Sequence, residues 1–161
     1  MSETKTKTVD DYIDTEKIKT PELPWQSSRV DKLAGALAKA QSEMTMVIKD
    51  GENPFFNSGY ATLSAVLTTV LPALNKNGLS IVQGTRYCTY TNGFYITATL
   101  MHESGQWTRS EIRMPIGKKD AHGVGAATTY GRRYLLSAIC GVAEQDDDGN
   151  GALDKAPNKK R

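Results

Sequence analysis

Two lysines followed by a short segment rich in tyrosine and arginine form the strongest local pattern of the sequence. Lys118 and Lys119 precede the run T-T-Y-G-R-R-Y over residues 128–134. On a helix, residues three or four apart share a face, so Tyr130 and Tyr134 are neighbours. Cationic side chains neutralise phosphates, and any base can stack on a tyrosine ring. The pattern therefore favours binding of single-stranded nucleic acid without sequence preference.

The segment that carries this pattern also needs an apolar side that holds it against the domain. Ala127, Gly131, Leu135 and Ala138 supply an inner stripe of small and apolar residues. Arg132 and Arg133 are expected to flank this stripe on the polar side of the helix. The two lysines are expected before the helix N-terminus, where backbone N–H groups favour anions. The alternative is an ordinary amphipathic helix whose arginines are solvated and whose tyrosines lie in the core.

Further candidate residues lie in predicted strands and in an aromatic loop. Arg109 and Arg113 share one sheet face by the two-residue period of a strand, and Arg86 adds a third cation. Residues 53–60 place three aromatic side chains in a loop, which either plugs the core or offers an aromatic lip to bases or to another subunit. The predicted DNA-binding residues are Lys118, Lys119, Tyr130, Arg132, Arg133, Tyr134, Arg86, Arg109, Arg113 and Tyr60.

Signatures of catalysis are mostly missing. No phosphate-binding G-x-x-x-x-G-K-[ST] loop is present, and neither histidine is paired with a nucleophile in a recognisable elbow. The acidic run Asp146–Asp148 fits the start of a calcium loop, but Pro157 stands where a bidentate glutamate is needed. We therefore predict no catalytic residue, no metal site and no cofactor. A solvated tail, a weak divalent-ion site and a partner-binding tail remain alternatives for the acidic run.

Charge and cysteine content narrow the class of protein. The chain has 161 residues and a net charge of +2, but residues 29–143 carry 12 basic and 7 acidic groups, while both ends are acidic. A basic domain between acidic ends weakly favours a polyanionic partner. Cys88 and Cys140 suit buried thiols in a reducing cytosol rather than a disulfide framework. With no signal peptide and no long apolar run, a cytoplasmic protein is expected.

Two helices are predicted before the sheet. Ser28 is a good N-cap, and an apolar stripe at helical spacing then runs to Val47, with an end near residues 50–51. The second helix is expected to begin within residues 58–61, to contain Pro72, and to end at an Asn-Gly pair.

The period then changes from helical to alternating. Residues 79–90, 94–102 and 106–114 are predicted strands joined by two tight turns, which makes an antiparallel meander. A third helix covers residues 122–140 and ends at Gly141. The order α-α-β-β-β-α predicts an α+β fold in which N-terminal helices and a long final helix pack on a three-stranded sheet.

The chain divides into three predicted segments. A flexible arm covers residues 1–27, the folded domain covers residues 28–143, and a flexible tail, first acidic and then basic, covers residues 144–161. Trp25 is unusual in a polar arm and is expected to dock onto its own domain or onto another subunit. The two predicted helices also carry more apolar surface than one small sheet covers, which predicts a homo-oligomer. This surplus comprises Leu33, Leu37, Val66 and Val70.

Four stretches of the sequence resemble the Erf (essential recombination function) family of phage single-strand annealing proteins. They are N-P-F-F-N-S-G-Y-A-T-L (53–63), L-P-A-L-N-K-N-G-L (71–79), the glycine-rich helix segment 123–143, and D-D-D-G-N (146–150). The resemblance covers about residues 30–151. Two departures are a glycine at position 131, where members commonly have alanine, and a short tail, from which we expect no C-terminal partner-binding domain like that of longer members.

The resemblance implies a protein that binds single-stranded DNA, forms rings or helical filaments, and pairs complementary strands without ATP. It also implies a β-β-β-α core shared with other annealing proteins, a role in recombination and repair, and an origin in a phage or prophage acting in the bacterial cytoplasm. A phage exonuclease or the host single-strand-binding protein is a further expected partner, and no membrane is. The alternatives are a non-catalytic phage scaffold or interaction module with a basic face, and a metal-dependent nuclease built on the acidic run.

Overall fold

Helices and two antiparallel sheets alternate in the part of the chain that the computed structural model describes, residues 24–53, 58–118 and 120–143. The order confirms the predicted α+β class and the β-β-β-α unit; the small β1–β2 sheet was not predicted. The elements are α1 (Asp31–Glu43), β1 (Gly51–Asn53), β2 (Ser58–Tyr60), α2 (Leu63–Lys76), β3 (Leu79–Cys88), β4 (Gly93–His102), β5 (Trp107–Met114) and α3 (Ala121–Cys140).

The larger sheet is the predicted antiparallel meander, in the order β3-β4-β5. Its register pairs Leu79 with His102 at one end of the β3–β4 hairpin and Cys88 with Gly93 at the other. Asn92, before Gly93, has a φ of 46°, a left-handed conformation that asparagine tolerates better than most residues. The Asn-Gly signal therefore marks the turn that the sequence predicted.

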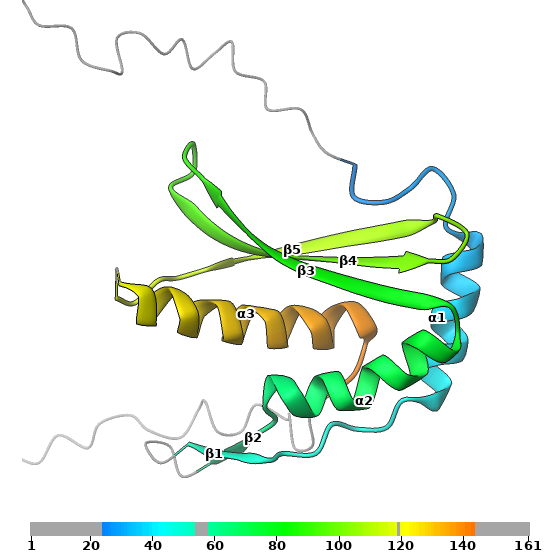
Figure 1. The fold of residues 1–161 in the computed structure, drawn as a ribbon, viewed down its shortest axis with the longest axis horizontal. Coiled ribbons are helices and arrows are strands. Elements are labelled where there is room, and N and C mark those ends of the chain that lie inside the picture. The colour runs from blue at the N-terminus through cyan, green and yellow to red at the C-terminus, as the bar shows by residue number, and fades with distance from the viewer. Residues whose placement is uncertain (1–23, 54–57, 119, 144–161) are drawn as a thin grey trace, which may run out of the picture.

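The helices pack on one face of this sheet. Figure 1 shows α3 and α2 beneath the sheet and α1 across its end. Ile96, Ala98 and Leu100 alternate along β4, and all three are fully buried, so this face of the sheet lies against the helices. No helix of the described residues covers the opposite face.

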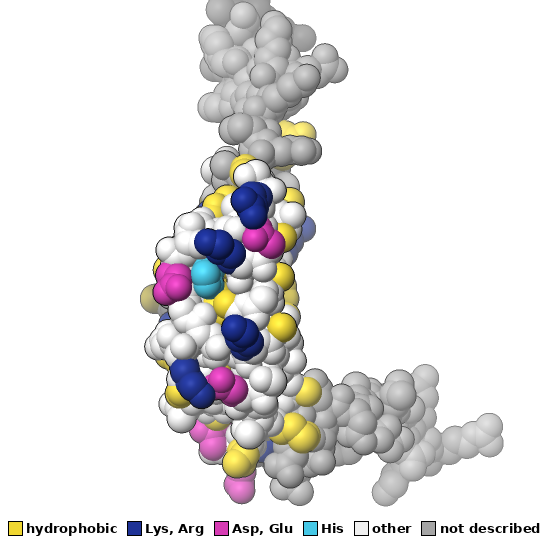
Figure 2. All heavy atoms as spheres, turned by 90° about the vertical axis from the view of Figure 1, so that its right-hand side faces the viewer, with side chains coloured by type: hydrophobic (Ala, Val, Ile, Leu, Met, Phe, Trp, Pro, Cys, Tyr) yellow, Lys and Arg dark blue, Asp and Glu magenta, His cyan; other side chains and the backbone are white. Residues whose placement is uncertain are grey.

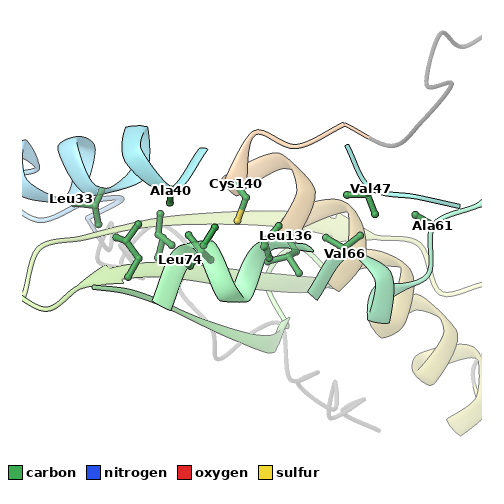
Figure 3. Packing of buried hydrophobic residues seen from close by; sticks show 12 residues of the cluster. Leu33, Ala40, Val47, Ala61, Val66, Leu74, Leu136 and Cys140 are labelled. Atoms are coloured by element: carbon green, nitrogen blue, oxygen red, sulfur yellow. The ribbon is translucent and has the colours of Figure 1, made fainter. Parts of the chain in front are cut away.

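The core lies where the three helices meet the sheet. Figure 3 shows Leu33 of α1, Val66 and Leu74 of α2, and Leu136 of α3 converging in one cluster. Burying an aliphatic side chain of this size contributes about 1.5–3 kcal/mol. The sequence argument for a homo-oligomer assumed that these helices leave apolar residues uncovered, and this assumption is wrong. Leu33, Val66 and Val70 are buried within a single chain, and Leu37 packs against the same cluster.

The predicted start and end of the first helix are both wrong. α1 begins after Val30, and the side chain of Val30 makes no cap. The free N–H groups of Lys32 and Leu33 instead donate to Oε1 of Gln106, at 2.9 and 3.0 Å. α1 ends at Glu43, and Val47 is buried in an extended segment whose N–H donates to the carbonyl of Ala143. A cap and a pairing partner that lie far away in the sequence override the local helical pattern.

The second helix begins later than predicted. α2 starts at Leu63, after Thr62, whose hydroxyl accepts a hydrogen bond from the N–H of Ala65. Asp50 in turn accepts hydrogen bonds from the N–H and hydroxyl of Thr62, and these lower the pKa of the Asp50 carboxyl. Ser58–Tyr60, expected in a loop or the start of the helix, pairs with β1 instead. Pro72 lies inside α2 as predicted, and the middle of the aromatic loop, residues 54–57, falls outside the described residues.

α3 packs tightly against the sheet at Gly131. A Cβ atom at this position would lie 2.4 Å from Cγ1 of Ile96 and 2.8 Å from Cγ of Met114. Both distances are too short for non-bonded carbon atoms, so only glycine lets the helix backbone rest at this depth. At this position, where members of the family commonly have alanine, an added methyl group would therefore force Ile96 or Met114 to move in this chain.

We predict that Gly131→Ala lowers the free energy of unfolding, although alanine is the better helix former. Overpacking a well-filled core costs about 1–3 kcal/mol, and the gain in helix propensity returns only about 1 kcal/mol. Gly125→Ala on the same helix is the matched control, because nothing lies within 4 Å of its new Cβ. We expect thermal unfolding to show a lower Tm for the first variant and an equal or higher Tm for the second. Equal shifts in the two variants would contradict the packing role of Gly131.

Candidate nucleic-acid interface

The outer side of α3 carries two shallow cavities on either side of Tyr130. One, of about 560 Å³, is lined by Tyr60, His122, Tyr130 and Arg133 among others. The other, of about 470 Å³, is lined by Lys118 and Tyr134, and shares Tyr130 and His122 with the first. The structure therefore brings together five of the predicted residues on this side of α3, namely Tyr60, Lys118, Tyr130, Arg133 and Tyr134. Arg132 lines neither cavity.

Arg133 is buried, so its predicted place on the polar side of the helix is wrong. Only 7% of the residue is exposed, and Nη1 donates a 2.8 Å hydrogen bond to the carbonyl oxygen of Ala61. Its guanidinium carbon lies 5.1, 5.3 and 4.8 Å from the ring centroids of Tyr60, Tyr130 and Tyr134. α3 packs against β2 and the start of α2 as well as against the sheet, and Arg133 faces this second contact.

Tyr130 and Tyr134 turn part of their rings to solvent. Their ring centroids are 6.2 Å apart, as neighbours on one helix face, and each residue is 46% exposed. The neighbour relation was predicted, but their shared contact with a buried cation was not. The guanidinium of Arg133 holds both rings from behind by cation–π attraction, while their outer parts remain open.

Arg132 is half-buried and ties α3 to β3. Its Nε donates to Oε1 of Gln83 at 3.3 Å, and Nε2 of Gln83 donates back to the Arg132 carbonyl at 2.9 Å. Lys118 is exposed in the loop before α3, and Lys119 lies outside the described residues. The N-terminus of α3 is capped by Asp120, whose Oδ1 accepts from the N–H of Gly123 at 2.7 Å.

The predicted strand arginines lie on a different surface. Arg86 and Arg113 are both opposite Tyr95 in the register, and Arg109 is opposite Thr99. These positions alternate with the buried residues of β4, so they occupy the sheet face that the helices leave uncovered. Arg109 and Arg113 do share a face as predicted. The sequence placed these arginines in one set of DNA-binding residues with the helix side chains, but the sheet separates them from the α3 surface.

Two aromatic residues on the uncovered face were missed from the sequence. The guanidinium carbon of Arg86 lies 4.4 Å from the ring centroid of Tyr95, and that of Arg109 lies 5.4 Å from the ring of Trp107. Arg86 also forms an ion pair with Glu111 at 2.8 Å. The two-residue period that grouped Arg109 with Arg113 also places Trp107 on their face, so the signal was present.

The end of the molecule formed by α1 has a different character. Figure 2 shows cations and anions interspersed there, without a region of single sign. Arg29 pairs with Asp31 at 3.0 Å, and Lys76 pairs with Glu43 at 3.0 Å. Such mixed, paired charges suit a solvated end of the domain rather than a binding surface for a polyanion.

The two cysteines occupy opposite environments. Hydrogen bonds from the hydroxyl and N–H of Thr91 and from Arg86 lower the pKa of Cys88, at the end of β3, to about 7. Burial raises the pKa of Cys140, in the helical core, to about 11. The expectation of two buried thiols therefore holds for Cys140, whereas Cys88 is only half-buried.

No described helix combines the length and apolar character needed to cross a bilayer. The described residues contain no cluster of three or more histidine, cysteine, aspartate or glutamate side chains that could hold a metal ion. The acidic run 146–148 lies outside the described residues.

The fold and its surfaces define a class: a non-repeating α+β chain built on a β-β-β-α unit that exposes arginine and aromatic side chains. A family model described as the ERF superfamily matches residues 33–161. The chain therefore belongs to the ERF superfamily, as its motifs indicated, and this is a family of phage recombination and annealing proteins. Comparison with curated proteins and with solved structures gives no match.

We predict that Arg133→Ala destabilises the fold, whereas Arg132→Ala costs little. Removing Arg133 leaves the carbonyl of Ala61 without this donor and opens a gap between three rings, a loss of about 2–4 kcal/mol. Arg132 is half-buried, and its loss should cost less than about 1 kcal/mol. Chemical denaturation of the two variants measures the difference. Equal stability of the two, with DNA binding lost only in Arg133→Ala, would make Arg133 a binding residue instead.

We predict that Cys88 reacts with iodoacetamide at neutral pH and that Cys140 does not in the folded protein. The thiolate is the nucleophile, and its fraction at Cys88 rises as the pH rises through about 7. Mass spectrometry of protein labelled from pH 5.5 to 9 gives the midpoint. Thr91→Val should move this midpoint upward, because it removes the largest cause of the lowered pKa. A midpoint unchanged by that substitution would contradict the assigned cause.

Proposed function

We propose that the protein binds single-stranded DNA without sequence preference and anneals complementary strands without ATP. The match to the ERF superfamily over residues 33–161 carries this proposal. Exposed arginine, lysine and aromatic side chains on the described surfaces support it, because cations neutralise phosphates and rings stack on unpaired bases.

The proposed contacts divide between the two surfaces. Next to α3, Lys118 and Lys119 hold phosphates, and Tyr130, Tyr134 and Tyr60 contact bases or shape the groove. Arg132 contributes charge at the edge of this surface, and the buried Arg133 acts by positioning the tyrosine rings. On the uncovered sheet face, Arg86, Arg109 and Arg113 hold phosphates. Pairing follows because phosphates lie against the protein and base edges remain accessible to a complementary strand.

The assembly and partners are part of the same proposal. We infer a homo-oligomer, either a ring or a helical filament, that presents a long unstacked strand. A phage exonuclease that makes single strands, or the host single-strand-binding protein that covers them, would act before it in the bacterial cytoplasm. The chemistry is binding rather than bond-making, so neither a catalytic residue nor a nucleotide cofactor has a role.

We predict that purified protein anneals two complementary dye-labelled oligonucleotides without nucleotide and without metal. Affinity for an unlabelled single strand should fall steeply with salt, with a log–log slope of about −0.7 for each phosphate neutralised. Oligonucleotides of unrelated sequence but equal length are the control and should bind alike. A requirement for ATP, or a binding constant that is indifferent to salt, would contradict the proposal. Shortened oligonucleotides after addition of magnesium would favour a nuclease instead.

A further inference from the structure

The uncovered face of the three-stranded sheet has the composition of a binding surface rather than of an ordinary solvated face. The middle of this face carries only small side chains, because the register places Gly84, Thr97 and Thr99 there. Aromatic and arginine side chains surround this centre. They are Trp25, Arg86, Tyr95, Trp107, Arg109 and Arg113.

The segment before α1 contributes Trp25 to this face. Gln26 bridges Thr108, the N–H of Arg109 donates to the carbonyl of Trp25 at 2.7 Å, and the N–H of Ser27 donates to the carbonyl of Trp107 at 2.9 Å. This antiparallel pairing puts Trp25 on the same face as Arg109. Trp25 is 56% exposed, so its backbone docks on β5 while its ring remains available. Both tryptophans of the chain therefore belong to one face.

The charge of this face is positive and only partly neutralised. Glu111 is its one acidic residue by register, and it pairs with Arg86. Arg109 and Arg113 donate to neutral oxygens, the Thr99 hydroxyl at 3.3 Å and the Thr91 carbonyl at 3.3 Å, and neither forms an ion pair with a carboxylate of the described residues. Two charges remain for phosphates.

The aromatic rings are spaced along the sheet. Trp107 lies opposite Met101, six residues along β4 from Tyr95, a distance of roughly 20 Å in a strand. A single strand several nucleotides long spans this distance. Duplex DNA does not offer its base faces to such rings, whereas unpaired bases do.

We propose that this face, which we call the sheet platform (Trp25, Arg86, Tyr95, Trp107, Arg109, Arg113), is where bases of single-stranded DNA stack, on Tyr95 and Trp107 with Trp25 extending the row. The inference rests on the proposed function and assigns base contacts to residues outside the α3 surface. A second copy of the chain is the rival occupant. A symmetric contact between two platforms would bring like charges together, which disfavours it.

Binding and fluorescence together test the platform. Anisotropy of a labelled thymidine 30-mer should show binding about tenfold weaker for Tyr95→Leu and for Trp107→Leu, by the usual loss per stacked base. Tyr90→Leu, an exposed tyrosine in the β3–β4 turn, is the matched control and should bind as the unaltered protein does. Glu111→Gln should bind more tightly, because it removes the carboxylate of the platform. In Trp25→Phe protein, Trp107 is the sole tryptophan, and the oligonucleotide should quench it.

Three other outcomes would contradict either the platform or the proposed function. One outcome is that the unaltered protein binds the 30-mer, that Tyr95→Leu and Trp107→Leu bind it with the same affinity, and that Trp107 fluorescence is not quenched. The platform is then overturned while the proposed function stands. If the two variants change the oligomeric state in light scattering without DNA, the face is a contact between copies and the platform is again overturned. If the unaltered protein binds no single strand, the proposed function fails and the platform with it. Circular dichroism melting of each variant shows whether its fold is retained.

Discussion

The contact between α3 and the sheet at Gly131 is the constraint on which the architecture depends. With no side chain at this position, the helix backbone lies directly against Ile96 and Met114, and a Cβ would come within 2.4 Å of Ile96. This depth lets Leu135 and Leu136 reach separate parts of the core, one under the sheet and one among the helices. A helix held further out would leave both leucines incompletely packed and the small domain short of buried apolar surface.

One consequence of this one-sided packing is a strongly two-faced sheet. Ile96, Ala98 and Leu100 of β4 are buried against the helices, so the residues between them face the side of the sheet that no described helix covers. On β5 these alternate positions hold Trp107, Arg109, Glu111 and Arg113, which is an unusual density of aromatic and charged groups. The same two-residue period that builds the core therefore also assembles the surface to which we assign stacking.

Local patterns in the sequence predicted the meander, the span of α3 and the Gly141 cap, because each depends on neighbouring residues. Contacts between distant residues decided the rest. Gln106 caps α1 from 73 residues away, and Asp50 holds the start of α2. The burial of Arg133 was missed because helical spacing gives one inner stripe, whereas α3 packs on two sides. A second stripe, through Leu136 and Cys140, also faces inward and includes Arg133.

Arginine placed against aromatic rings occurs on both sides of the sheet, and exposure separates the two roles. Around Arg133 three tyrosine rings enclose the cation, and its hydrogen bond to Ala61 fixes the segment between β2 and α2 to α3, so its charge serves the fold. Arg86 and Arg109 lie over single rings at the surface, where a base could take the other side of the ring and a phosphate the guanidinium. Binding through such pairs needs little rearrangement, because the guanidinium is already held beside the ring. A surface preorganised in this way suits a protein that must hold many unrelated sequences in the same extended form.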